Sequence, residues 1–421
     1  MNRFYFYITT AKLAFFFDKI GSFYLKVITI IYIYARYIFI AQIESNMRNK
    51  TKLFIFLALF FVSAVAQGQD SLKIIFAGDL MGHGGQIKAA QTADGRYDYS
   101  PCWKFIKDYV QSADLAIANF ELTLAGPPYK GYPQFSSPDQ VLVDACNAGF
   151  DIFTTVNNHC MDGGKKGFMR TLYVFDSLGV PHLGTYRNAE EREKGHPMMV
   201  ERNGFKLGLV TYTYGTNGLP VPDPLVVNMI DTAQMKADLA RAKELGAEYT
   251  IVLIHWGEEY HTKANAEQEM LAKLLLDKGA DIVIGGHPHV VQNATMDALP
   301  QNDITPQIVV YSMGNLVSNQ RDINTDGGIM IELTLKRNAQ ASKLSGNPSI
   351  QQECLYMPYW VYRGEYDGLY QYYILPSNDA CHNPEKYQLP PADMKALTIF
   401  DENTRLRLQG QLKERLYYWM P

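Results

Sequence analysis

The chain has 421 residues, which allows two or three domains, or one large α/β domain with an appendage. Its 39 Lys and Arg residues and 43 Asp and Glu residues leave a net charge of −4. A protein with this balance lacks the basic surface that nucleic-acid binding requires, so we exclude nucleic acid as a partner.

Residues 47–66 have the order of a secretory signal peptide. A short basic segment is followed by an uncharged apolar run, and small residues stand at Ala64 and Ala66. We therefore expect cleavage before Gln67. The mature protein is then expected outside the cytoplasm, in the periplasm or at the cell surface.

Residues 1–46 precede this signal and are rich in Phe, Tyr and Ile. We interpret them as an upstream leader translated in error, with Met47 as the true start. The alternative is a transmembrane helix over Val27–Ile43, a stretch of marginal length for a membrane span.

From Leu72 onward, short β-rich runs alternate with polar turns and helical patterns. The runs predict strands at Leu72–Ala77, Asp114–Ala118, Asp151–Val156, Lys206–Tyr212, Tyr249–Ile254, Asp281–Ile284, Gln307–Tyr311 and Gly328–Leu335. Apolar residues three and four apart predict helices at Lys165–Leu178, Thr232–Leu245 and Ala266–Lys278. The alternation predicts an α/β fold with much parallel sheet, in which ligands bind beyond the carboxyl ends of the strands.

The character of the sequence changes after Arg337. A polar segment is followed by an aromatic-rich stretch over residues 356–373 and by a helical pattern over Pro391–Tyr418. Aromatic residues interleaved with glycine can stack on sugars or on a polymer. We interpret residues 338–421 instead as a C-terminal extension that packs against the main domain, residues 67–337.

Polar side chains follow five of the predicted strands at the point where each strand ends. They are Asp79, then Asn119 and Glu121, then Asn158 and His159, then His255 and Glu259, and finally His287 and His289. Imidazole is the commonest metal ligand among side chains. Because side chains two apart on an extended backbone share one side, His287 and His289 are expected to face one point.

Each of these residues also has a purely structural explanation. Asp79 can be a turn residue, Asn158 a helix cap and His255 a hydrogen-bonded core histidine. Together, however, they form a mixed set of oxygen and nitrogen ligands. Such a set suits Mn, Fe, Zn or Ni, and fits neither a structural thiolate site nor a calcium cage.

Six motifs in order give the chain a resemblance to a known family. They are GDLM at Gly78–Met81, NFE at Asn119–Glu121, NNHCMDGG at Asn157–Gly164, HWGEEY at His255–Tyr260, GGHPHVVQ at Gly285–Gln292 and SMGN at Ser312–Asn315. Their succession resembles the CapA-type bacterial capsule synthesis proteins of the calcineurin-like metallophosphoesterase superfamily. The resemblance runs from about Leu72 to Leu335. It implies a four-layer α/β/β/α sandwich with a dinuclear metal centre at one edge of its two sheets.

The resemblance also implies roles for single residues. One metal ion is held by Asp79 and His289, the other by Asn158, His255 and His287, and Glu121 bridges the two. His159 protonates the leaving oxygen, while Asn119 and Glu259 orient ligands or a bound water. The chain lacks the Asp-x-His of the wider superfamily at its first strand. His83, four positions after Asp79, is not assigned as a ligand.

The implied function is capsule or poly-γ-glutamate biosynthesis, with two divalent metal ions (Mn, Fe or Zn) as cofactors. The expected substrate is a phosphoester or an anionic capsule polymer, and the candidate partners are membrane proteins of capsule synthesis. Because two divalent ions activate water and offset charge on a phosphoryl oxygen, we predict an exported phosphoester hydrolase. Two alternatives stay open. One is a polymer assembly or export factor with a structural metal site, and the other is a hydrolase of γ-glutamyl amides.

Overall fold

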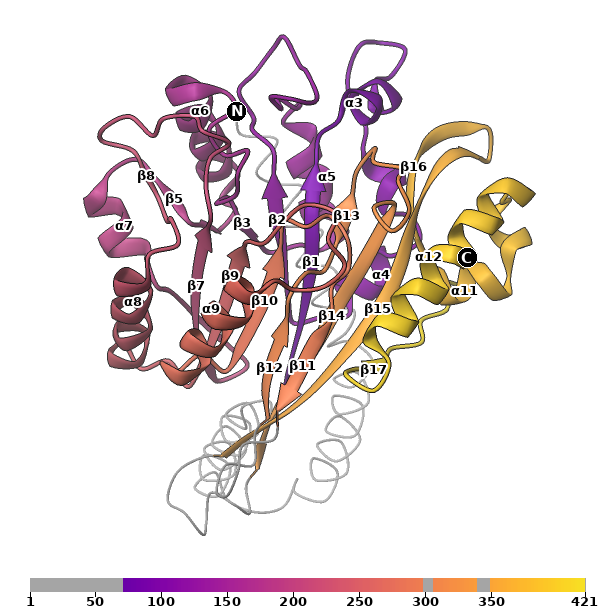
Figure 1. Cartoon of the computed structure of the whole chain (residues 1–421). Helices are drawn as coiled ribbons and strands as arrows, with labels where there is room; N and C mark the ends of the chain where they lie inside the picture. The colour runs from indigo at the N-terminus through magenta and orange to yellow at the C-terminus, as the bar shows by residue number, and fades with distance from the viewer. Residues whose placement is uncertain (1–70, 298–305, 339–348, 421) are drawn as a thin grey trace, which may run out of the picture. The chain divides into compact units, whose positions relative to one another are not determined.

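The computed structural model describes residues 71–297, 306–338 and 349–420 (Figure 1). The predicted signal peptide and the upstream leader lie outside these residues. The described residues belong to one compact unit. No helix in this part of the chain combines the length and hydropathy of a membrane span.

Two large β-sheets form the centre of the molecule (Figure 1). The nine-stranded sheet consists of β1 (Ser71–Met81), β2 (Leu115–Glu121), β3 (Ile152–Thr154), β4 (His182–Leu183), β13 (Asn315–Val317), β14 (Gly327–Asn338), β15 (Ser349–Tyr366), β16 (Leu369–Pro376) and β17 (Lys413–Glu414). The six-stranded sheet consists of β6 (Met198–Arg202), β7 (Phe205–Thr213), β9 (Tyr249–His255), β10 (Ile282–Gly286), β11 (Ala294–Asp297) and β12 (Gln307–Val310). A small ribbon pairs β5 (Thr185–Tyr186) with β8 (Val226–Val227). All eight predicted strands are present.

Much of each sheet is parallel, as the alternation of strands and helices predicts. Strands β1 to β4 run parallel in the first sheet, and β7, β9, β10 and β12 run parallel in the second. Strands β14, β15 and β16 add an antiparallel half to the first sheet. The parallel strands therefore bring the carboxyl ends of β1, β2, β9 and β10 to one edge.

Helices pack around the two sheets. They are α3 (Gly84–Ala90), α4 (Lys107–Gln111), α5 (Gln140–Ala148), α6 (Gly164–Leu178), α7 (Ala189–Gly195), α8 (Thr232–Glu244), α9 (Ala266–Asp277), α11 (Ser377–His382) and α12 (Pro391–Leu408), with short 3-10 turns at Ser100–Trp103 and Pro384–Tyr387. The three predicted helices α6, α8 and α9 are confirmed within a residue at each end. Asp231 caps α8 by accepting hydrogen bonds from two backbone amides of its first turn.

The layers follow from alternation of side chains along the strands. On β1, Ile74 and Phe76 face the six-stranded sheet, where they share a core with residues such as Ile251 and Ile284. Ile75 and Ala77 face the other way, onto a core that includes residues of α4, α5 and α6. On the far side of the six-stranded sheet, α8 and α9 pack over β7 and β9. This arrangement is the predicted four-layer α/β/β/α sandwich.

The residues after 337 continue the nine-stranded sheet. The aromatic-rich stretch forms β15 and β16, and most of its rings are buried, with Tyr370 an exposed exception. These rings pack against the sheet and α12 and do not offer a stacking surface. The predicted helix over Pro391–Tyr418 is too long. It ends at Leu408, because Gly410 adopts a left-handed conformation (φ 75°) and the chain turns into β17.

Candidate metal centre

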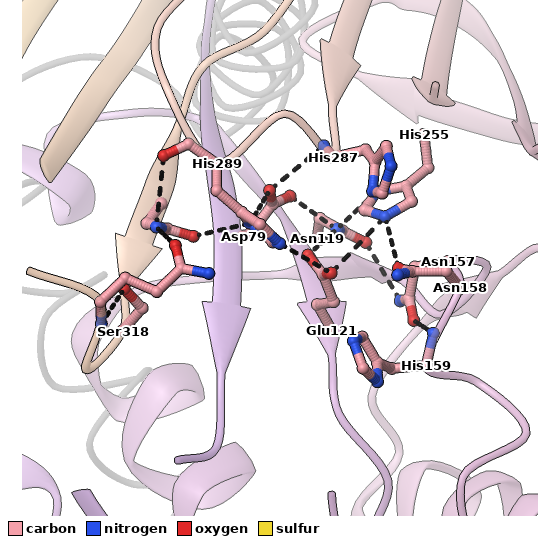
Figure 2. A network of polar contacts seen from close by, with 12 residues as sticks. Asp79, Asn119, Glu121, Asn157, Asn158, His159, His255, His287, His289 and Ser318 are labelled. Atoms are coloured by element: carbon pink, nitrogen blue, oxygen red, sulfur yellow. Dashed lines mark hydrogen bonds and ion pairs between the residues drawn. The ribbon is translucent and has the colours of Figure 1, made fainter. Parts of the chain in front are cut away.

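Five strands deliver the predicted site residues to one edge of the two sheets (Figure 2). Asp79 belongs to β1, Asn119 and Glu121 to β2, and His255 is the last residue of β9. His287 and His289 follow β10, and Asn158 and His159 follow β3. All of these side chains are buried except that of Asn119, which is partly exposed. The structure therefore brings together residues spread over more than two hundred positions.

His287 and His289 converge by a different route from the predicted one. Strand β10 ends at Gly286, and both histidines have positive φ angles, 98° for His287 and 58° for His289. The expectation that an extended backbone aligns them is therefore wrong. Two left-handed residues turn the chain back so that the ring centroids lie 6.0 Å apart. Non-glycine residues in such conformations are strained and concentrate at functional sites.

Within the part of the chain that the structure describes, three groups of side chains have metal-ligating atoms within 4.8 Å of one another. The first group is Glu121, His255 and His287, and the second is Asp79, Glu121 and His289. Glu121 belongs to both groups, which is the position of a bridging ligand. The third group joins the exposed Glu259 to His287 and His289.

Two buried atoms of this cluster have no hydrogen-bond partner among the described residues. They are Oε1 of Glu121 and Nδ1 of His287. The Glu121 side chain is 0% exposed, and its Oε1 faces Nε2 of His255 at 3.6 Å and Nε2 of His289 at 3.8 Å. A buried carboxylate and a buried imidazole that lack partners are costly to keep unless a cation satisfies them. The donor set therefore fits divalent metal ions.

His289 is held in a defined orientation by Asn315. Its Nδ1 lies 3.0 Å from Oδ1 of Asn315 and 3.4 Å from Oδ2 of Asp79, so Nε2 faces the cluster. Burial opposes ionisation of Asp79, but the hydrogen bond to His289 and the nearby imidazoles hold the pKa of Asp79 well below its usual value. Asp79 is therefore an anion near neutral pH.

Asn119 lies among three of the proposed ligands. Its amide nitrogen donates to Oδ1 of Asp79 at 2.8 Å and lies 3.5 Å from Glu121 and 3.3 Å from Nδ1 of His255. Its carbonyl oxygen accepts from Thr154 at 3.0 Å. This geometry suits the orienting role that the sequence resemblance implies.

Asn158 and His255 meet on the other side of the cluster. Oδ1 of Asn158 lies 2.8 Å from Nε2 of His255, the same nitrogen that faces Glu121. The Asn158 amide donates to Asn217 at 3.2 Å, so its oxygen is turned inward. Nε2 of His255 and Oδ1 of Asn158 therefore lie side by side next to Glu121.

His159 stands beside the cluster with one nitrogen already engaged. Its Nδ1 lies 2.8 Å from Oδ2 of Asp162, and its ring packs edge-on against Phe135. Burial lowers its pKa, but the Asp162 hydrogen bond and the charge of Glu121 outweigh burial and raise the pKa of His159 above its usual value. Nε2 is thus the nitrogen that can exchange a proton with a ligand.

The rim of the site carries aromatic residues and His83. The ring of Tyr214 lies 4.4 Å from that of His287, and the exposed ring of Tyr260 lies 6.2 Å from that of His289. Nδ1 of His83 lies 3.3 Å from Oε1 of Gln86 and 3.3 Å from the backbone amide of Asn319. His83 belongs to none of the three groups of ligating side chains described above.

Two positioning residues, Asn315 and Asp162, were missed by the sequence reasoning. Both lie in motifs noted above, SMGN and NNHCMDGG, and each orients a histidine of the cluster. The signal that could have found Asp162 is its spacing of three from His159 in a turn. Asn315 carries no comparable local signal, because its partner His289 is 26 residues away in the chain.

Comparisons with known proteins agree with the motifs. The model of the family described as bacterial capsule synthesis protein PGA_cap matches residues 73–320. The capsule biosynthesis protein CapA of Bacillus anthracis is 27% identical over 283 residues, which cover 65% of this chain and 66% of that protein. The PGA biosynthesis protein CapA of Bacillus subtilis (strain 168) is 26% identical over 287 residues, with 64% and 69% covered. The match thus spans about two thirds of each relative.

Two solved structures are also similar. The NAD nucleotidase NadN of Haemophilus influenzae gives a TM-score of 0.44 at 13% identity, covering 82% of this chain and 65% of that one. The 5'-nucleotidase of Candida albicans SC5314 gives a TM-score of 0.38 at 11% identity, covering 79% and 57%.

Proposed function

We propose that this chain, which belongs to the family of bacterial capsule synthesis proteins PGA_cap, is an exported hydrolase that uses two divalent metal ions to cleave a phosphoester during capsule biosynthesis. One observation carries the proposal. Buried ligating side chains at the ends of five strands converge, and Glu121 belongs to two of the groups of ligating side chains described above. Its Oε1 has no hydrogen-bond partner among the described residues.

The proposed ligands divide into two sets around Glu121. Asp79 and His289 would hold one ion, and Asn158, His255 and His287 would hold the other. Asn119 and Asn315 would orient these ligands through the hydrogen bonds described above. Glu259 is close enough to His287 and His289 to orient either histidine or to contact a ligand directly.

The chemistry combines the ions with one proton donor. Two divalent ions in such a site lower the pKa of a shared water and offset charge on a phosphoryl oxygen during in-line attack. Nδ1–H of His159 donates to Asp162, so the transferable proton is the second one, which Nε2 carries in the imidazolium form that the raised pKa of His159 favours. As the bond between phosphorus and the leaving oxygen breaks, Nε2 of His159 donates that proton to the leaving oxygen.

The names of the two relatives support a place in capsule or polyglutamate synthesis. We propose an anionic capsule polymer or a phosphoester attached to it as the substrate, and membrane proteins of capsule synthesis as partners. The order of residues 47–66 supports export to the periplasm or the cell surface, with a mature chain that begins near Gln67. Amino-terminal sequencing of the protein from its native host checks this cleavage site, and recovery of residues 1–46 on the cell-associated protein would refute it.

The proposed reaction is tested by an activity screen of the purified protein with Mn²⁺, Zn²⁺ or Fe²⁺. Chromogenic phosphodiesters, phosphomonoesters and γ-glutamyl amides serve as the three substrate classes. Metal-dependent cleavage of a phosphoester supports the proposal. Cleavage of the γ-glutamyl amide alone favours the amide hydrolase, and bound metal without any turnover favours the assembly factor.

A further inference from the structure

A loop of the rim connects the proposed metal centre to two arginines. It follows β13, and the first residue of that strand, Asn315, orients His289. The next part of the loop contacts His83, because the backbone amide of Asn319 lies 3.3 Å from Nδ1 of His83. The side chain of Asn319 contacts the first of the two arginines, because its Oδ1 accepts a hydrogen bond from Arg363 at 3.0 Å.

Arg321 is the second arginine, and part of its guanidinium lacks a partner. Nη2 is buried and forms no hydrogen bond among the described residues, while Nη1 donates to the backbone oxygen of Gln320 at 3.0 Å. The guanidinium carbon lies 5.6 Å from the ring centroid of Tyr372. A buried donor without an acceptor is unfavourable, so an oxyanion that reached Nη2 would satisfy it.

The two arginines meet the same pair of side chains, because Arg363 donates to Asn319, and Arg321 lies over the ring of Tyr372, whose hydroxyl donates to Asn319 at 2.6 Å. Neither guanidinium forms an ion pair within the described part of the chain, and Arg363 is exposed on β15. Burial first, and then the charge of Arg363, lowers the pKa of Arg321. Asp326 and Asp393 are near enough to act on this charge electrostatically, but neither contacts it as an ion pair.

Two rows of contacts connect this pair to the centre. In the first row, the His83 ring packs edge-on against Phe135 at 5.2 Å, and Phe135 packs against the His159 ring at 4.6 Å. His83 in turn contacts Asn319, which contacts Arg363. The second row leads from Gln320, beside Arg321, to Asn315 at 2.8 Å and on to His289, so the arginines border the rim of the centre.

We propose that Arg321 and Arg363 form an anion subsite at the rim of the centre, which binds a carboxylate or phosphate of an acidic chain. Guanidinium groups suit this role because their planar donors match both oxyanions in a bidentate manner. That the bound chain is a substrate of the centre rests on the proposed function. Binding of the anion by the two arginines does not require turnover, so the two proposals fail separately.

The test compares binding of two fluorescent probes, a γ-linked oligoglutamate and a polyphosphate of similar charge, to the full-length protein with Mn²⁺ added. The variant is R321Q/R363Q, and the matched control is K236Q/K243Q, which removes the same charge from the exposed side of α8. We expect the Kd of at least one probe to rise about ten- to a hundredfold in R321Q/R363Q, since two charge-assisted contacts are lost. The control is expected to bind like the wild type.

The probe that loses affinity identifies the oxyanion, and loss with either probe supports the subsite. Equal affinity of R321Q/R363Q and wild type for both probes would overturn it, as would an equal loss in K236Q/K243Q. Metal content and melting temperature confirm that the variants are folded. If the double variant does not fold, the single variant R363Q, at an exposed position, gives the same comparison.

Discussion

His159 and His287 differ in what their ring nitrogens contact. Nδ1 of His159 is bound to Asp162 at 2.8 Å, whereas Nδ1 of His287 is buried without a hydrogen-bond partner among the described residues. In the proposed function, the first histidine donates a proton, and the second binds a metal ion through its free nitrogen. Their substitution therefore separates the two functions.

We expect His287→Ala to lose metal content and hydrolytic activity together. His159→Asn is expected to keep its metal while turnover falls roughly a hundred- to ten-thousandfold, as for a lost general acid. The loss should be smallest for substrates with good leaving groups, because such oxygens depart without a proton. Metal analysis and steady-state kinetics on a series of aryl phosphoesters measure both effects. Loss of metal from His159→Asn would instead make His159 a ligand.

At the level of single residues, the types of the clustered side chains were predictable. The backbone conformations and neighbouring side chains that position them were not. Strand ends carrying Asp, Glu, Asn and His at one sheet edge indicated Asp79, Glu121 and His255. The left-handed backbone of His287 and His289 was not predictable, because nothing in their local sequence requires it. Asn315 was missed because its contact with His289 exists only in the folded chain.

Among the elements, β10 is placed by close contact of its glycines with neighbouring chain segments. A Cβ added to Gly285 would lie 2.0 Å from the backbone oxygen of Tyr311 and 2.5 Å from Nε1 of Trp256. A Cβ added to Gly286 would lie 2.8 Å from Oδ1 of Asp79. The strand that precedes His287 can therefore approach the centre only with glycine at these positions.

Gly285→Ala is expected to lower the free energy of unfolding by about 1–3 kcal/mol, the usual cost of overpacking, and to reduce metal content. Urea unfolding and metal analysis measure the two effects. Gly215→Ala is the control, because a Cβ there meets no atom within 4 Å. Equal stability of both variants would show that β10 does not depend on this close approach.

Helices α7 and α8 are joined by a buried network around Asp238. Asp238 accepts from Arg192 at 2.7 Å and lies 3.3 Å from Nε2 of His196, which is 1% exposed. Burial lowers the pKa of His196 below 6.5, although Asp238 opposes this shift. The unfolded chain therefore binds a proton at His196 more readily than the folded protein does.

Because the pKa of His196 is lower in the folded protein than in the unfolded chain, its full contribution to stability is expected above pH 6.5. The contribution should decline as the pH falls below this value. Between pH 7.5 and pH 5.5, the wild type should lose more unfolding free energy than His196→Gln. Asp238 does not interfere, because its pKa is lowered from 3.8 to about 2, with its ion pairs outweighing burial. Equal losses in urea titrations at the two pH values would exclude this role of His196.

The elements themselves were largely predictable, because their hydrophobic periodicity is strong. The eight strands and three helices follow from alternation and from apolar residues three and four apart. The end of α12 was not found, since Gly410 lies within a pattern that stays compatible with a helix up to Tyr418. The pairing of β15 with β14 depends on contacts across the sheet, which local sequence does not encode.

For the whole molecule, the centre lies where the two sheets meet, so its charges bear on the stability of the fold. Asp79 and Glu121 are both 0% exposed. Removal of bound cations would leave these carboxylates crowded without counter-charge, and the folded state would lose a ligand that binds it preferentially. Chelation should therefore lower the melting temperature, and added Mn²⁺ or Zn²⁺ should restore it. A melting temperature that changes with neither chelation nor added metal would show that the centre does not contribute to the stability of the fold.

The metal content of the purified protein tests the central claim most directly, namely that five strand ends build a two-metal site. Elemental analysis of the wild type should find about two divalent ions per chain, as in other two-metal hydrolases. The same analysis of His287→Ala and His289→Ala should find less metal in each. A wild-type protein that carries no metal and binds none on addition of Mn²⁺, Fe²⁺ or Zn²⁺ would contradict the account.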